Sequence, residues 1–245
     1  MENAASHDAA RALLAFWRAA GVDMDEAEAV FTARPAQPAP EQGQSLPERQ
    51  PFRIEPPPPK AKPKAKLQPA EDAVNMARAL SAQATSVAAL RAAVDKFEGC
   101  ALKATARNTV FSDGVDGAPV LVLGEAPGKD EDEQAKPFVG RSGQLLDKML
   151  ATIGLDRKSN VLISNTIYWR PPGNRDPTQG ETVSCLPFVE RLIELSQPKL
   201  LILAGKAAAH TLLKREDGVM KLRGRRLFYN REGLTAPINA MVMLH

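Results

Sequence analysis

The chain has 245 residues, of which 44% are hydrophobic and 25% are charged, a composition typical of a globular protein with room for one substantial α/β domain. Its net charge of +3 suits a polyanionic partner, although surplus surface lysines would give the same value. Two cysteines exclude a disulfide framework. The N-terminus lacks a signal-peptide pattern, and no apolar run reaches the roughly 20 residues that span a bilayer. We therefore expect a cytoplasmic monomer without membrane association.

Three segments of different composition follow one another along the chain. Residues 1–33 carry one apolar stripe at helical spacing, which predicts an N-terminal helix. Residues 34–70 are rich in proline and lysine and cannot bury enough apolar surface to offset the entropy of ordering, so they predict a disordered linker. Its lysines either contact DNA backbone or serve as a solubilising tether. Residues 71–245 form the folded domain.

Strand and helix patterns alternate within residues 71–245. The run Val120–Leu123 is continuously apolar and ends in glycine, as is typical of a buried parallel strand. The alternation predicts right-handed crossovers and a three-layer α/β/α fold around a central, mostly parallel four-stranded sheet, with ligands beyond the carboxyl ends of the strands. We expect helices at 71–96, 144–153, 178–195 and 206–213, and strands at 120–123, 160–166, 199–204 and 240–244, with a loop or hairpin before the last strand.

Two glycine-containing loops follow the first strand. In residues 124–128, glycines allow close backbone approach to a ligand and place the Glu125 carboxylate over the sheet edge, although a purely structural turn has the same pattern. In residues 136–143, Gly140, Arg141 and Ser142 precede a helix whose free N–H groups suit a DNA phosphate. Phe138 beside them is either a core residue or a platform for a flipped base.

Polar residues also mark the ends of later strands. Asn165 carries an amide that both donates and accepts, which suits the Watson–Crick edge of a pyrimidine. The rigid loop that follows contains Arg170 and Arg175, which would contact DNA backbone or form an ordinary surface turn. His245 ends the fourth strand, whereas His210 lies within a helix pattern and is interpreted as structural.

These segments, in this order and spacing, resemble family 4 uracil-DNA glycosylases over residues 97–245. The resemblance implies an enzyme that flips uracil out of DNA and hydrolyses its N-glycosidic bond, which initiates base excision repair. The alternative is a non-catalytic uracil- or DNA-binding module of a polymerase or repair assembly, with repair or polymerase proteins bound through residues 1–70. The motifs are GEAPG at 124–128, KPFVGRSGQLL at 136–146, SNTIYWRPPGNRDPT at 164–178, CLPFVERLIEL from Cys185, PKLLILAGKAAA at 198–209 and the terminal MVMLH.

The resemblance also implies how uracil is held and released. Phe138 would stack on the flipped base, and Asn165 would hydrogen-bond its edge and reject cytosine. His245 would donate to uracil O2 as negative charge builds on the leaving base.

The loop after the first strand would act on the sugar and the water. Glu125 would stabilise the positive sugar or help to place water, and Gly124 and Ala126 would line the uracil pocket. Family 1 enzymes carry a water-activating aspartate at the position of Ala126, so leaving-group stabilisation is expected to dominate here.

The sequence departs from the family at the four cysteines that normally hold a [4Fe–4S] cluster. Cys100 and Cys185 align with two ligand positions, but Lys103 and Trp169 occupy the other two. Because such clusters need thiolate ligands, we expect no cluster, metal or other cofactor, with Trp169 and the stem of Lys103 filling the space. The family continues past the histidine motif, so we also expect a fragment or truncated chain, with a carboxylate beside His245 that opposes an anionic leaving base.

Overall fold

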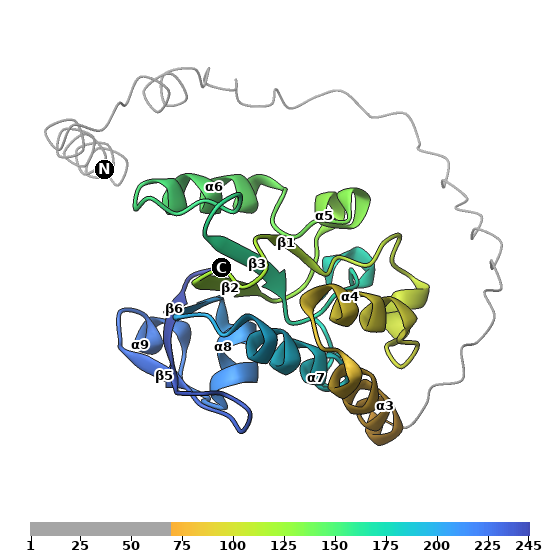
Figure 1. Ribbon diagram of the computed structural model, residues 1–245. Coiled ribbons are helices and arrows are strands. Elements are labelled where there is room, and N and C mark those ends of the chain that lie inside the picture. The colour runs from red at the N-terminus through yellow and green to blue at the C-terminus, as the bar shows by residue number, and fades with distance from the viewer. Residues whose placement is uncertain (1–69) are drawn as a thin grey trace, which may run out of the picture. The chain divides into compact units, whose positions relative to one another are not determined.

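The computed structural model describes residues 70–245 (Figure 1). The N-terminal helix and linker expected in residues 1–69, and the partner contacts expected there, lie outside the described residues. Within residues 70–245, no helix is long and apolar enough to cross a membrane.

A six-stranded mixed sheet forms the centre of the domain, in the order β1-β3-β2-β4-β6-β5. The central four strands are parallel, which confirms the predicted mostly parallel α/β fold. The expected strand count of four is corrected to six, because two three-residue strands pair antiparallel at the two edges. The strands are β1 Ser112–Gly114, β2 Val120–Gly124, β3 Val161–Asn165, β4 Leu200–Ala204, β5 Leu227–Tyr229 and β6 Ile238–Met243.

The helices agree with the predicted ones except near the start of the domain. The single helix expected over 71–96 is two helices, because Ser86 caps the second one by accepting a hydrogen bond from the Ala89 N–H at 3.1 Å. A short helix before Phe138 and another before β5 were not predicted. The α-helices are α3 Ala70–Gln83, α4 Val87–Lys96, α5 Lys129–Gln134, α6 Arg141–Ala151, α7 Gln179–Ser196, α8 Lys206–Leu213 and α9 Val219–Leu222.

The sheet lies between two helical layers, with α6 on one side and α3, α7 and α8 on the other (Figure 1). Alternate residues of a strand point to opposite faces. Leu121 and Leu123 accordingly pack into the larger core with α7, whereas Val120 and Val122 belong to a smaller core beneath α6. Burial on both faces explains why the central strands are continuously apolar in sequence.

The parallel register brings the predicted site residues to one edge of the sheet. Gly124 at the end of β2 pairs with Asn165 at the end of β3. Ala204 at the end of β4 pairs with Met243, two residues before His245. The carboxyl ends of β2, β3 and β6 therefore present the 124–128 loop, Asn165 and His245 on the same side.

Candidate active site

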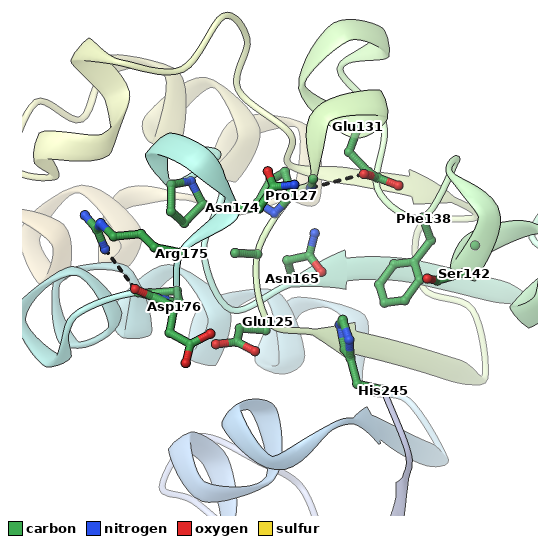
Figure 2. Close-up of a pocket in the computed structure, with 15 residues that line it drawn as sticks. Glu125, Pro127, Glu131, Phe138, Ser142, Asn165, Asn174, Arg175, Asp176 and His245 are labelled. Atoms are coloured by element: carbon green, nitrogen blue, oxygen red, sulfur yellow. Dashed lines mark hydrogen bonds between the residues drawn. The ribbon is translucent and has the colours of Figure 1, made fainter. Parts of the chain in front are cut away.

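A cavity of about 350 Å³ opens at this edge of the sheet (Figure 2). It collects side chains from five separate parts of the chain, including most of the residues predicted from the sequence. The lining residues are Glu125, Ala126, Pro127, Gly128, Glu131, Phe138, Ser142, Gly143, Asn165, Pro171, Asn174, Arg175, Asp176, Pro177 and His245.

Asn165 is the most deeply buried polar group of the cavity. Its side chain is only 2% exposed, and its amide makes no hydrogen bond to the other residues drawn around the cavity (Figure 2). Backbone contacts fix its position, since the Thr166 N–H donates to the Gly124 carbonyl at 2.9 Å and the Ile167 N–H to the Glu125 carbonyl at 3.0 Å. The side chain lines the cavity, so the amide is placed to bind a ligand there.

Gly124 allows the two base-contacting candidates to meet. A Cβ at this position would lie 2.5 Å from Asn165 Oδ1 and 2.5 Å from Phe138 Cζ, both far below van der Waals contact. Any side chain at 124 would therefore displace the amide or the ring. Gly124 was expected to line the uracil pocket, but it is not part of the cavity wall. Instead it leaves the space in which Asn165 and Phe138 face the same cavity.

Phe138 reaches the cavity from a turn with an uncommon backbone conformation. Its φ of 54° lies in the left-handed region, which is sparsely populated by aromatic residues. Glu131 supports the following residues, because its Oε1 accepts the Val139 N–H at 3.0 Å and the Gly140 N–H at 2.9 Å. Its Oε2 accepts the Gly128 N–H at 3.1 Å, so one carboxylate joins both loops of the site.

Glu131 was not predicted from the sequence, because it lies in the charged run KDEDEQ, which is typical of a solvated helix face. The available signal was its position three residues after the turn glycine Gly128, at the start of a helix, where a glutamate can accept the N–H of the N-cap residue, as Glu131 does at 3.1 Å.

Glu125 and His245 also line the cavity, and in the view of Figure 2 both lie below Asn165. Burial raises the pKa of Glu125, and the carboxylate of Asp176 raises it further, while His245 acts in the opposite direction. Figure 2 shows the Glu125 and Asp176 carboxylates pointing toward each other, and Asp176 was not predicted. Gly205 lets His245 approach, since a Cβ there would lie 2.9 Å from the histidine Cβ.

The predicted phosphate-binding residues do not all face the cavity. Ser142 lines it at the start of α6, while exposed Arg141 does not. The Gly140 N–H already donates to Glu131, which removes that donor from the expected anion site.

The two arginines of the 169–175 loop are engaged by neighbouring side chains. Arg170 donates to Asn174 Oδ1 at 2.7 Å and is absent from the cavity wall. Arg175 does line the cavity, but it forms a two-point ion pair with Glu181 at 2.9 and 2.7 Å.

The positions of the family's cluster ligands do not fit an iron–sulfur cluster in this chain. Cys100 and Cys185 are both buried, and the neighbouring Cys100 side chain together with burial raises the pKa of the Cys185 thiol. Trp169 is 1% exposed, with its indole N–H bonded to Thr109 Oγ1 at 3.2 Å. Two thiols cannot supply four thiolate bonds, and residues 70–245 contain no cluster of three or more histidine, cysteine or acidic side chains able to hold a metal.

Lys103 behaves differently from the expectation that its stem fills the cluster space. Its ammonium group donates to the Asp95 carbonyl and to Glu98 Oε1, each at 2.5 Å, and the side chain is 21% exposed. The space is filled mainly by Trp169, whose ring centroid lies 6.2 Å from that of Phe97.

The fold and the cavity together define an α/β protein with a buried amide, an aromatic ring and a helix N-terminus gathered at the edge of a parallel sheet, as expected of a protein that holds an extruded base. The model of the family described as "Uracil DNA glycosylase superfamily" matches residues 111–245 of this chain. The chain belongs to this superfamily and, within it, to the type 4 uracil-DNA glycosylases.

Three relatives, each named a type-4 uracil-DNA glycosylase, give the extent of the similarity. The Archaeoglobus fulgidus protein is 42% identical over 118 residues, covering 48% of this chain and 59% of its own length. The Saccharolobus solfataricus protein is 37% identical over 142 residues, covering 56% and 65%. The Thermotoga maritima protein is 34% identical over 132 residues, covering 54% and 68%. The chain thus spans about 60% of the length of the first two relatives.

Proposed function

We propose that this chain removes uracil from DNA by hydrolysing the bond between the base and the sugar. The observation that carries the proposal is that Asn165, which is 2% exposed, and the ring of Phe138 line one cavity. An amide reads a pyrimidine edge, and an aromatic ring stacks on an extruded base. Membership of the type 4 family supports the same substrate.

Base choice follows from the hydrogen-bonding pattern of Asn165. Its amide N–H donates to uracil O4, while its carbonyl accepts the uracil N3–H. Cytosine presents an acceptor at N3 and an amine donor at C4, so both contacts become mismatched. Each unmatched buried polar group costs about 1–3 kcal/mol, so two mismatches give discrimination of about 30-fold or more.

Bond cleavage leaves negative charge on the base and positive charge on the sugar. His245 donates a hydrogen bond to uracil O2, and removal of such a preorganised donor typically costs about 3–4 kcal/mol. Glu125, which lines the same cavity, supplies negative charge for the sugar and a hydrogen-bond acceptor for the attacking water. Ala126 offers no proton acceptor, so we assign the largest share of the rate to stabilisation of the leaving base.

DNA enters the site through contacts at the cavity rim. The start of α6 offers the N–H groups of Arg141 and Ser142 to a phosphate, because a helix N-terminus favours an anion. Arg141 is exposed at this position and adds positive charge.

The test is uracil release from a labelled oligonucleotide with enzyme in excess. Incubation with single- and double-stranded uracil substrates should yield free uracil and an alkali-labile abasic site, and Asn165→Ala should abolish most of this release. A matched thymine oligonucleotide controls for nonspecific cleavage. Tight binding of uracil DNA without release of the base by the wild-type chain would reject the proposal in favour of a binding module.

A further inference from the structure

The turn that carries Phe138 is held by its carbonyl groups as well as by its N–H groups. Arg157, in the loop between α6 and β3, donates from Nη2 to the Phe138 carbonyl at 2.9 Å and from Nη1 to the Pro137 carbonyl at 3.2 Å. Glu131 accepts the next two N–H groups on the other side of the turn. Hydrogen bonds therefore hold the peptide groups on both sides of the Phe138 Cα.

Two carboxylates hold the guanidinium group in place. Asp113 on β1 accepts from Nη1 at 2.9 Å, and Asp147 on α6 accepts from Nη2 at 2.8 Å and from Nε at 3.0 Å. The Arg157 side chain is only 14% exposed. Burial lowers the pKa of Arg157, but the hydrogen bonds to Asp113 and Asp147 more than offset this effect, so the group stays charged.

We propose that Arg157 is a positioning residue that holds the Phe138 ring in the cavity as a platform for the flipped base. This proposal rests on the proposed function and adds to it a residue that does not line the cavity itself. Residues in sparsely populated backbone regions persist only where their surroundings over-determine them. Without the guanidinium, the Phe138 carbonyl can turn away, and the ring turns with it.

The geometry calls for arginine rather than any cation. The guanidinium is a planar fork with five donors, and here it serves four acceptors in different directions. A lysine would keep the charge near Asp113 and Asp147 but has one nitrogen, which cannot also reach both carbonyls. Arg157→Lys therefore separates positioning of the turn from charge balance.

A double-mutant cycle with Phe138→Ala tests the proposal, because coupled residues lose additivity. In the wild-type background, Arg157→Lys should slow single-turnover uracil release by about tenfold or more. In the Phe138→Ala background, the same substitution should change the rate by less than about twofold. Equal slowing in both backgrounds would show that Arg157 acts through general stability and would overturn the proposal.

Arg191→Lys is a matched control. Arg191 likewise binds a backbone carbonyl, that of Ala84 at 2.7 Å, and a carboxylate, that of Glu194 at 2.9 Å, but it lies outside the cavity wall. Its substitution should leave uracil release unchanged in both backgrounds. Asp147→Asn removes one charged acceptor of Arg157 and tests the same proposal if Arg157→Lys fails to fold. It should lower the rate of uracil release by less than Arg157→Lys does, and this effect should also disappear when Phe138 is alanine.

A binding measurement separates this proposal from the proposed function. The ratio of affinities for an oligonucleotide that carries a non-cleavable uracil nucleotide and for an abasic oligonucleotide reports stacking on Phe138 without any turnover. Arg157→Lys should lower the affinity for uracil DNA and leave the affinity for abasic DNA within about twofold. If the wild-type chain binds uracil DNA preferentially but releases no base, the activity fails while the positioning role stands. An unchanged ratio, or a Phe138→Ala variant with wild-type binding and rate, refutes the positioning role.

Discussion

Replacement of Gly143 by alanine is the smallest change that should disable the site without unfolding the domain. Gly143 lies in the first turn of α6, and a Cβ there would be 1.9 Å from the Phe138 carbonyl oxygen and 2.1 Å from its carbon. Ordinary contact begins near 3.4 Å, so the carbonyl must retreat by about 1.5 Å. Because this carbonyl is the one held by Arg157, the ring of Phe138 moves with it.

Gly143→Ala is expected to lower the rate of uracil release more strongly than it lowers the stability of the domain. Overpacking of this kind costs about 1–3 kcal/mol, while alanine is favoured over glycine inside a helix by about 1 kcal/mol. The net destabilisation is therefore about 0–2 kcal/mol. A displacement of about 1 Å at a positioning group can cost about 100-fold in rate, which corresponds to about 2.7 kcal/mol of activation free energy.

Thermal unfolding and single-turnover uracil release, measured on the same samples, check this prediction. Gly180→Ala is the control, because Gly180 also lies in the first turn of a helix, α7, but has no atom within 4 Å of the position of its Cβ. It should retain the wild-type rate and a stability equal to or slightly above wild type. A Gly143→Ala variant with uracil release within about twofold of wild type would refute the close packing of Phe138 against α6 as a requirement for catalysis.

Four further outcomes are expected from other parts of the domain. Asn165→Asp loses the donor to uracil O4, so the activation free energy of uracil release should rise by about 1–3 kcal/mol, with a trace of cytosine release. His245→Ala should instead slow the release of either base without changing the ratio of the two rates. Single-turnover assays on matched uracil and cytosine oligonucleotides distinguish the two results. Because the proposed role of Glu125 needs its ionised form, activity should fall as the pH drops through its raised pKa. Asp176→Asn removes a negative neighbour and lowers the pKa of Glu125. This variant should therefore move the acid limb of the pH–rate profile to lower pH. Protein purified anaerobically should contain no stoichiometric iron or acid-labile sulfide. Trp169→Ala should destabilise the domain by about 3–5 kcal/mol in denaturant unfolding, because the side chain is fully buried.

The central strands were predictable because their sequence reflects their environment. Strands such as Leu200–Ala204 are buried on both faces and read as uninterrupted apolar runs. The edge strand Ser112–Gly114 carries no such pattern, since it has three residues and exists only through its pairing with β3. The break between α3 and α4 was visible only as Thr85 and Ser86, which local propensity alone does not separate from a continuous helix.

The candidate site was predictable to the extent that its residues end strands. Asn165 and Glu125 follow apolar runs, so topology alone placed them at one edge. Glu131 and Arg157 were missed because they resemble solvated charges in sequence, and only their contacts with the Phe138 turn show their role. Conversely, Arg175 looked like a DNA contact in a basic loop, but the structure pairs it with Glu181.

Aromatic packing around Trp169 connects the segments that carry the four cluster-ligand positions of the family. A cluster would join positions 100, 103, 169 and 185 through bonds to one inorganic core. Here Trp169 packs between Phe97, at 6.2 Å between ring centroids, and Tyr168, at 6.0 Å, while Phe97 packs on Phe188 of α7 at 5.1 Å. The same segments are therefore joined through the packing of aromatic side chains. Because Trp169 lies on the segment that runs from Asn165 to the cavity-lining loop 171–177, this packing anchors the wall of the cavity on which base recognition depends.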